Sequence, residues 1–352
     1  MPEVPARRPT MTDVAQAAGV SAMTVSYTYS QPARVSKQAA AKVKAAAKQL
    51  GYPGPHPGAR SLRRGRSGTV GVVLGEHLAY AFADPQAARF LAGVADVCAE
   101  HGVGMTLLPV TGRDDDAERL AEAAVDGFVV WTTADDDPVL DAVLARGLPA
   151  VVHGGPGRTN LPTVSIDDRA AALAIGREAF VGARRPSVLS FPLDRARDSL
   201  LLSGPDPEIA TFPVTRHRLQ GLRNAWLESG RPWSDVQVAV CSKNDAALGA
   251  AHSARLLQQQ NAPDAVAAMS DELALGALHA AGDLDVPVPA ALAVTGWDDT
   301  DAAEAAGLTT VRQSLREQGA QCARLALDLP TVPSQPRWRL VRRDTSRGAT
   351  AT

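Results

Sequence analysis

The chain of 352 residues has little of what several classes of protein require. Its three cysteines, Cys98, Cys241 and Cys322, are widely spaced and odd in number, which argues against a disulfide framework and a CxxC metal site. Residues 1–10 contain no apolar run of the kind found in a secretory leader. No stretch approaches the roughly 20 apolar residues that a membrane-spanning helix needs. These absences predict a cytoplasmic protein with reduced, buried thiols and no membrane partner.

Motifs for nucleotide or metal chemistry are also missing. No Gly-x-Gly-x-x-Gly follows a predicted strand, no Gly-x-x-x-x-Gly-Lys loop exists, and no cluster of His, Asp, Glu and Cys has metal-ligand spacing. The segment Ser242–Asp245 resembles part of a hydrolase motif but lacks partner residues at matching spacing. These absences argue against an α/β enzyme and predict a protein without cofactor or metal.

Charge is unevenly distributed, although the formal net charge is only −2. Residues 1–66 contain eleven Lys and Arg against two acids, Glu3 and Asp13, so this segment carries 11 − 2 = +9 and the remainder carries −2 − 9 = −11. A compact cationic segment ahead of an acidic body is typical of a protein that binds a polyanion through that segment. Charge alone leaves a solvated basic tail as the alternative.

The cationic segment begins with a pattern of three short helices. Thr10 and Asp13 match a capping box at the start of the first helix, and Gly19 supplies the turn that follows it. Ser21 and Ser36 are suitable N-caps for the second and third helices. Two helices joined by a tight turn and followed by a third make a helix-turn-helix. The expected helices end near Ala18, Ser30 and Leu50.

A linker and a short basic segment follow the third helix. Residues 52–58 hold three prolines and two glycines, a composition that prevents the helix from continuing. Residues 59–64, Ala-Arg-Ser-Leu-Arg-Arg, are long enough for one or two helical turns. Because so short a helix is unstable alone, this hinge segment is expected to become ordered only on binding a partner.

From residue 69 onward, short β-branched runs alternate with helical stretches. This alternation predicts parallel sheets covered on both faces, and ligands in such folds bind beyond the carboxyl ends of the strands. Residues 193–213 have few such cues and are expected to form an irregular loop. The expected strands are Thr69–Leu74, Val103–Pro109, Gly127–Trp131, Pro149–His153, Ser187–Phe191, Val236–Val240, Ala265–Ala268 and Leu292–Thr295. The expected helices are Pro85–His101, Ala117–Val125, Arg169–Phe180, His217–Glu228, Ala246–Gln260 and Glu272–Ala281.

Several motifs, taken together, resemble the lac/gal repressor family. The resemblance begins with Thr-Asp-Val-Ala-Gln-Ala-Ala-Gly-Val-Ser-Ala-Met-Thr-Val-Ser at residues 12–26. Motifs in family order then run to residue 345, so nearly the whole chain is covered. They are Val35-Ser36, Leu50–Tyr52, Ala59–Leu62, Thr69–Val73, Met269–Ala277, Val294–Asp299, Leu308–Gln313 and Leu340–Thr345.

The resemblance implies a transcription regulator, most commonly a repressor, that binds double-stranded DNA as a homodimer. Each all-α helix-turn-helix head would read half of a palindromic operator. Behind it, an α/β core of two parallel-sheet subdomains, shaped like a periplasmic sugar-binding protein, would bind a small polar, sugar-like effector. The implied organisation is a head at 1–52, a linker and hinge at 53–67, and a core at 68–346, divided into an N-subdomain (about 68–165 plus 298–325) and a C-subdomain (about 166–297 plus 326–346).

The resemblance places base-reading side chains at Ala22, Met23 and Tyr27 on the second helix. The family usually has Arg where Tyr27 stands. Since Arg can hold guanine with two hydrogen bonds and Tyr cannot, more apolar readout is expected here. Packing in the small core is the alternative for Met23 and Tyr27.

Other side chains are implied to contact the DNA backbone or the minor groove. Leu62, beside Arg60, is expected to wedge into the central minor groove as apolar side chains do in DNA-bending proteins. Helix capping is the alternative role of Ser21 and Ser36. The residues at phosphate-contacting positions are Thr10, Ser21, Thr24, Ser26, Ser30, Ser36 and Lys37.

Arg218 and Asp298 stand where the family points an arginine and an acid into the cleft between its subdomains. A guanidinium and a carboxylate together can bind vicinal hydroxyl groups, and a structural ion pair is the alternative. Asp168 is a further polar candidate, and Ser270 stands where the family often has Asn.

Two more effector-binding candidates have plain structural alternatives. Asp271 is expected either to contact the effector or to cap the helix that starts at Glu272, and Trp297 either to stack on a sugar face or to lie in the core. Trp131, His153 and His77 also lie at expected strand ends and are interpreted as structural.

Overall fold

The computed structural model describes residues 9–54, 66–75, 82, 84–110, 112, 115–331 and 335–350. The chain divides into two compact units, Met1–Ser67 and Gly68–Thr352. The division falls at the expected end of the hinge segment. The expected hinge helix itself, with Arg60 and Leu62, lies outside the described residues, as does His77.

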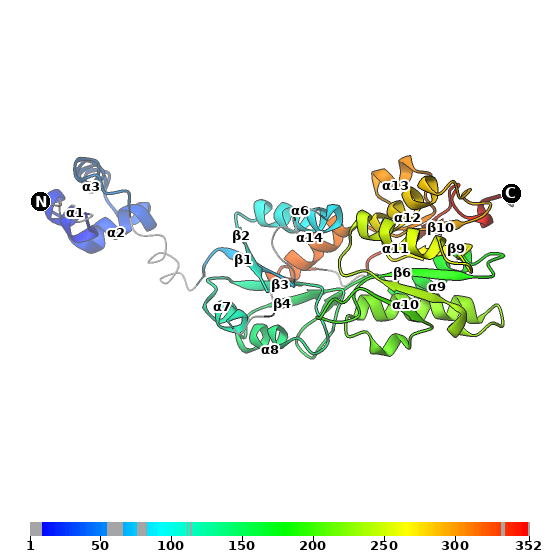
Figure 1. The fold of residues 1–352 in the computed structure, drawn as a ribbon. Coiled ribbons are helices and arrows are strands. Elements are labelled where there is room, and N and C mark those ends of the chain that lie inside the picture. The colour runs from blue at the N-terminus through cyan, green and yellow to red at the C-terminus, as the bar shows by residue number, and fades with distance from the viewer. Residues whose placement is uncertain are drawn as a thin grey trace, which may run out of the picture. The chain divides into compact units, whose positions relative to one another are not determined.

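The first unit contains the three helices that the sequence predicts (Figure 1). At its start, the Thr10 side chain accepts from the Asp13 backbone N–H while the Asp13 carboxylate accepts from the Thr10 N–H, which completes the capping box. Val14, Val25 and Val43 are fully buried and hold the helices together as a helix-turn-helix. The elements are α1 (Met11–Ala18), α2 (Ala22–Ser30), η1 (Pro32–Arg34) and α3 (Lys37–Leu50).

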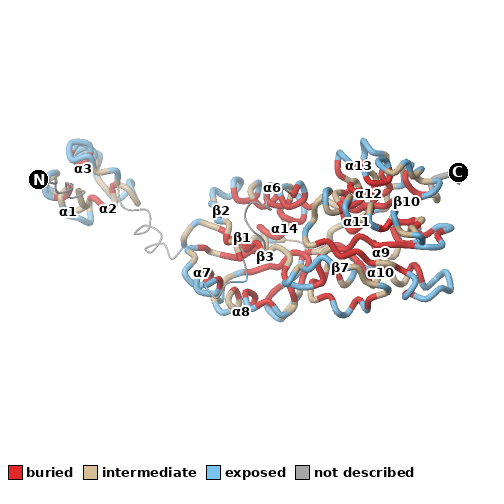
Figure 2. Tube along the Cα trace, viewed as in Figure 1, coloured by how far each residue is buried: buried red, intermediate tan, exposed pale blue. Residues whose placement is uncertain are grey.

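The second unit begins with a five-stranded parallel sheet in the order β2-β1-β3-β4-β5. The middle strands are apolar on both sides because helices cover both faces (Figure 2). The strands are β1 (Thr69–Leu74), β2 (Gly104–Pro109), β3 (Gly127–Trp131), β4 (Ala150–His153) and β5 (Thr163–Val164). The helices are α6 (Pro85–Glu100) and α14 (Leu315–Ala326) on one face, and α7 (Asp116–Glu122) and α8 (Pro138–Ala145) on the other.

A second five-stranded sheet follows, in the order β10-β9-β6-β8-β7. Its strands are β6 (Pro186–Ser190), β7 (Leu200–Ser203), β8 (Gln237–Val240), β9 (Ala265–Ala268) and β10 (Ala293–Thr295). The helices are α9 (Asp168–Ala179) and α10 (Pro213–Leu227) on one face, and α11 (Ala246–Leu257) and α12 (Asp271–Asp283) on the other. Short 3-10 helices are η2 (Pro207–Ile209), η3 (Trp233–Asp235) and η4 (Arg347–Thr350).

The prediction of an irregular loop over 193–213 was wrong in its middle. Strand β7 lies within this range and runs antiparallel to β8, with Leu200 opposite Val240. Its partner is about forty residues away along the chain, so the local pattern contained no sign of the pairing. An antiparallel edge strand on an otherwise parallel sheet is common.

The expected assignment of 298–325 to the first subdomain was also wrong in its first half. Helix α13 (Asp301–Ala305) and strand β11 (Thr310–Arg312) belong to the second subdomain, since Ala303, Leu308 and Val311 are fully buried in its cores. Strand β12 (Arg339–Val341) pairs with β11 there. Only α14 returns to the first sheet.

The three cysteines are buried and unpaired, as predicted. Burial raises the pKa of the Cys241 thiol to about 12 and that of Cys98 above its usual value, so these thiols stay protonated. Within the described ranges, no helix is long and apolar enough to cross a membrane. The same ranges contain no group of three or more His, Cys, Asp or Glu that could hold a metal ion.

Helices α6 and α14 pack so closely that glycine is required at their contact. A Cβ atom at Gly319 would lie 2.1 Å from the carbonyl oxygen of Phe90, and one at Gly93 would lie 1.9 Å from that of Arg316. Both obstacles are backbone atoms, which cannot rotate away. The close approach is what joins the late helix α14 to the first sheet.

Gly319→Ala is expected to lower the free energy of unfolding by about 1–3 kcal/mol, because the two helices must move apart. Urea unfolding followed by circular dichroism measures the change. Gly282→Ala is the matched control, since an added Cβ in α12 would meet nothing within 4 Å; it should be neutral or stabilising by about 0.5–1 kcal/mol. Equal effects of the two substitutions would contradict the close packing.

Candidate functional site

Helix α2 of the first unit presents an exposed, largely uncharged surface. Met23 is 63% exposed and Ala22 is also exposed, so the packing alternative for Met23 is ruled out. Tyr27 is half-buried, is absent from the small apolar core, and has the Arg34 guanidinium 5.8 Å from its ring centroid. These three positions remain available for contact with a large partner.

The hydroxyl residues of the head divide by exposure. Ser21 and Ser36 cap α2 and α3, accepting from the N–H groups of Thr24 and Ala39, and both side chains remain near the surface. Ser26, in contrast, is buried, and its carbonyl accepts from the Ser30 hydroxyl. Thr10 is half-buried in its capping box and Lys37 is exposed.

The second unit contains a cavity lined by both of its subdomains, with about 900 Å³ of space when its open mouth is included. Parallel strands of both sheets end here, which is where ligands bind in this architecture. The lining residues from the first subdomain and α14 are Asp84, Gln86, Trp131, Thr132, His153, Leu315 and Gln318; those from the second are Ser165, Asp168, Phe191, Pro192, Arg197, Phe212, Val214, Thr215, Arg218, Asn244, Asp298 and Gln313.

Arg218 of α10 occupies the cavity floor and is held on three sides. Its Nε donates to Asp168 at 2.8 Å and its Nη1 to the carbonyl oxygen of Met269 at 2.6 Å. Its guanidinium lies 3.9 Å from the Trp297 ring centroid, a cation–π distance. Arg218 and Asp298, predicted together from the family positions, both line the cavity, but the ion-pair partner of Arg218 is Asp168, which was predicted as a separate polar candidate. Trp297 contacts the arginine from the core.

Asp298 faces the arginine from the end of β10, in a left-handed backbone conformation with φ of 112°. Its Oδ1 accepts from Nε2 of Gln313 at 2.7 Å. Burial raises the pKa of Asp298 well above its usual value, and the nearby Arg218 opposes that shift. A non-glycine residue in this conformation costs free energy, and such strain is concentrated at functional sites.

The prediction that Ser270 lines the site was wrong. Ser270 caps α12, is fully buried, and donates its hydroxyl proton to Oδ1 of Asn244 at 2.6 Å. Asn244 in turn reaches across the cavity and donates to Oδ2 of Asp84 at 3.0 Å. The amide that lines the cavity thus belongs to Asn244, and Ser270 positions it.

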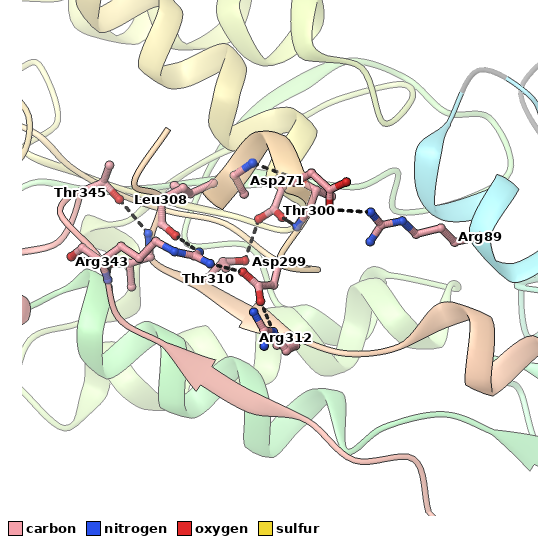
Figure 3. A network of polar contacts seen from close by, with 12 residues as sticks. Arg89, Asp271, Asp299, Thr300, Leu308, Thr310, Arg312, Arg343 and Thr345 are labelled. Carbon is pink, nitrogen blue, oxygen red and sulfur yellow. Dashed lines mark hydrogen bonds and ion pairs between the residues drawn. The ribbon is translucent and has the colours of Figure 1, made fainter. Parts of the chain in front are cut away.

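Asp271 and Trp297 do not line the cavity either. Asp271 is buried, where Oδ2 accepts from the Thr300 N–H and Oδ1 from the Thr310 hydroxyl, each at 2.7 Å (Figure 3). Burial raises the pKa of Asp271 to about 6. The capping role expected for Asp271 falls to Ser270, the N-cap of α12, whereas Asp271 holds the start of α13 and strand β11 through Thr300 and Thr310. Trp297 lies in the core, as its structural alternative predicted, and contacts Arg218.

Most lining residues were not assigned to the site from the sequence, and Trp131, His153, Asp84 and Gln86 are four of them. Trp131 and His153, interpreted as structural, stack with ring centroids 4.8 Å apart in the wall of the cavity. Their position at the carboxyl ends of β3 and β4 was the available signal. Asp84 and Gln86 lie at the start of α6, where no sequence motif marked them.

Polar contacts join the two subdomains around the cavity. Arg216 of α10 donates to Asp135, which follows β3, at 2.5 Å, and Asp135 also donates its N–H to the Thr211 carbonyl. At the outer edge, Arg89 of α6 pairs with Asp301 of α13 at 3.1 Å (Figure 3). The exposed pair of Arg89 and Asp301 is worth at most about 1 kcal/mol.

Comparison with known proteins identifies similar sequences for both units. Residues 10–54 match the model for bacterial regulatory proteins of the lacI family, and residues 200–346 match a periplasmic binding protein-like domain. An HTH-type transcriptional regulator of Mycobacterium tuberculosis is 36% identical over 94% of this chain and 93% of its own. The HTH-type transcriptional regulator IpsA of Corynebacterium glutamicum is 34% identical over 91% of each chain.

Solved structures agree with this fold. A LacI family transcriptional regulator from Corynebacterium glutamicum has a TM-score of 0.72 and 29% identity over 96% of this chain and 99% of its own. The regulator CelR in complex with cellobiose has a TM-score of 0.63 and 29% identity over 96% of this chain and 100% of its own. The lac repressor dimer on its operator shares the fold, with a TM-score of 0.72 at 22% identity over 96% and 99% of the two chains.

Asp271→Ala is expected to lower the free energy of unfolding by about 2–4 kcal/mol, because the Thr300 N–H and the Thr310 hydroxyl lose their buried acceptor. Chemical denaturation measures it. Asp301→Ala, at a side chain that is 97% exposed, is the control and should change stability by less than about 1 kcal/mol. An Asp271→Ala protein of unchanged stability would contradict the structural role.

Proposed function

Because the chain belongs to the lacI family of bacterial regulatory proteins, a family of DNA-binding transcription regulators, we propose that it is a repressor controlled by a small effector. In this proposal two copies of the chain bind a palindromic operator, and an uncharged polar molecule in the cavity of the second unit regulates that binding. The protein would act in the cytoplasm, on the nucleoid.

The observation that supports an effector most strongly is the arrangement around Arg218. A guanidinium has five N–H donors, so Arg218, paired with Asp168 and lining the cavity with Asp298, can donate to a ligand as well. Its position between two subdomains resembles the binding site of a solute-binding protein more than a structural ion pair. The CelR structure in complex with cellobiose supports a sugar-like effector for this chain.

The exposed surface of α2 supports the operator contact. Ala22, Met23 and Tyr27 offer methyl groups, a thioether and a ring, which suit thymine methyl groups better than guanine edges. Thr24, Ser21, Ser36 and Lys37 would contact phosphates, and so would Thr10 and Ser30, whereas the buried Ser26 would need a local shift. Arg60 and Leu62 remain predictions from the sequence, with Leu62 as the minor-groove wedge.

The effector would act by changing how tightly the two subdomains close. It touches residues of both, so it favours the closed state by the difference between its affinities for the two states. A difference of a few kcal/mol between the effector's binding free energies for the two states suffices to change the occupancy of an operator severalfold to a hundredfold. Release of DNA on effector binding is the proposed direction.

Selection of duplexes from a random library with the purified chain tests the operator proposal. The expected result is an inverted repeat bound by two copies, with mass measured by sedimentation, since a twofold protein requires a twofold site. Binding should weaken steeply with salt because several phosphates are contacted. A single, non-repeated site bound by one copy would contradict the proposal.

Arg218→Ala is expected to bind the selected operator as wild type does but to lose its response to an effector found by thermal-shift screening, since a central hydrogen-bonding group is removed. Fluorescence anisotropy of labelled operator measures both properties. Arg177→Ala, which breaks an exposed ion pair with Glu228 on the same subdomain, is the matched control and should respond normally. A normal response of Arg218→Ala would place the effector elsewhere.

A further inference from the structure

Two residues in the cavity wall each have a buried polar atom that has no hydrogen-bond partner among the residues the structure describes. They are Nε2 of Gln86 and Nδ1 of His153, in side chains that both line the cavity. Each residue is only 7% exposed. Because an unpaired buried polar atom costs about 1–3 kcal/mol, two of them in one cavity wall point to a ligand that supplies their partners.

The two side chains belong to the same part of the wall. Gln86 lies one helical turn before Phe90 on α6, so both project from the same face of that helix. The ring centroids of Phe90 and Trp131 each lie 4.8 Å from that of His153 and 4.4 Å from each other, so the three rings form one cluster. The amide and the imidazole therefore lie at the first-subdomain side of the cavity, away from the pair of Arg218 and Asp168.

A chain of hydrogen bonds determines which ring nitrogen of His153 carries the proton. Asp298 Oδ1 accepts from Nε2 of Gln313, Oε1 of Gln313 accepts from Nε2 of Gln318, and Oε1 of Gln318 lies 3.0 Å from Nε2 of His153. Nε2 of His153 must then be the donor, which leaves Nδ1 with a free lone pair. Burial lowers the pKa of His153 to about 4, so the ring is neutral at physiological pH.

The charged groups that line the cavity already have partners in the protein. Arg218 is paired with Asp168, Asp84 accepts from two N–H groups of α6 and from Asn244, and Arg197 donates to the carbonyl of Gly75 while lying over Phe212. A charged group of a ligand at the Arg218 side of the cavity would therefore have to compete with the ion pair of Arg218 and Asp168. An uncharged ligand would not.

We propose that Gln86 and His153 form a hydroxyl-binding subsite, in which Nε2 of Gln86 donates to and Nδ1 of His153 accepts from hydroxyl groups of an uncharged polyol. A hydroxyl group is both donor and acceptor, so it satisfies both orphaned atoms. A carboxylate could not donate to Nδ1, and an ammonium could not accept from Gln86. This inference rests on the proposed effector function and assigns the group that the first subdomain recognises.

The test is isothermal titration calorimetry on the full chain without DNA, so that its outcome is independent of operator binding. The probes are uncharged hexoses, pentoses, disaccharides and cyclitols, each next to its uronate, amino or phosphorylated counterpart. The expected result is binding of an uncharged member and at least about 10-fold weaker binding of its charged counterparts. If only charged members bind, the effector function stands and this inference is overturned; it is equally overturned if none binds.

Single-deoxy analogues of the bound polyol then identify the subsite. Removing one particular hydroxyl group should lower the affinity of the polyol for the wild-type chain about 5- to 50-fold. The same removal should lower its affinity for Gln86→Met only slightly, because this substitution has already removed the amide donor at similar side-chain volume. Gln260→Met, at an exposed glutamine, is the control and should behave as wild type. His153→Phe should give the same result as Gln86→Met, and a cooperative thermal unfolding transition shows that this variant is folded.

If every deoxy analogue loses the same factor in affinity with Gln86→Met as with wild type, no hydroxyl group contacts this side chain, and the proposed subsite is overturned. Since Gln86→Met keeps the hydrogen bond between His153 and Gln318, its result decides the matter even where the His153→Phe protein does not fold.

Discussion

The second unit depends on a single buried arginine and the groups that hold it. Arg218 joins the start of α9 through Asp168, the end of β9 through the Met269 carbonyl, and the end of β10 through the ring of Trp297. A guanidinium that is 6% exposed is tolerated only when it is paired and hydrogen-bonded. These three contacts therefore define one wall of the cavity, and they place the donors of that wall before any ligand enters.

Pre-formed walls on two subdomains make the cavity suited to regulation. The Arg218 wall belongs to the second subdomain, and the opposite wall, with Gln86, Trp131 and His153, belongs to the first. Contacts such as the partly buried pair of Arg216 with Asp135 join the two subdomains. In the proposed function, a ligand that contacts both walls would favour the arrangement in which the two subdomains are closed around it.

Local patterns were sufficient for most elements of the fold. Strands β1, β3 and β9 have the boundaries that β-branched runs predicted, and Thr10, Ser21 and Ser36 cap the helices they were expected to cap. Local sequence patterns were insufficient where an element packs against a partner that lies far away along the chain. Edge strand β7 is stabilised by the distant β8, and the place of α14 against α6 depends on backbone contacts at Gly93 and Gly319.

For the site, the sequence by itself determined which chemistry is present: the family motifs that contain Arg218 and Asp298, and the cationic head with its capped helices. Tertiary structure decided which side chains share a surface. It buried Ser270, Asp271 and Trp297 as supports, brought Asn244 to Asp84, and added Gln86 and His153 to the wall. The physical reason is that capping and apolar periodicity act over a few residues, whereas burial and hydrogen-bond partnership across a cleft join segments more than a hundred residues apart.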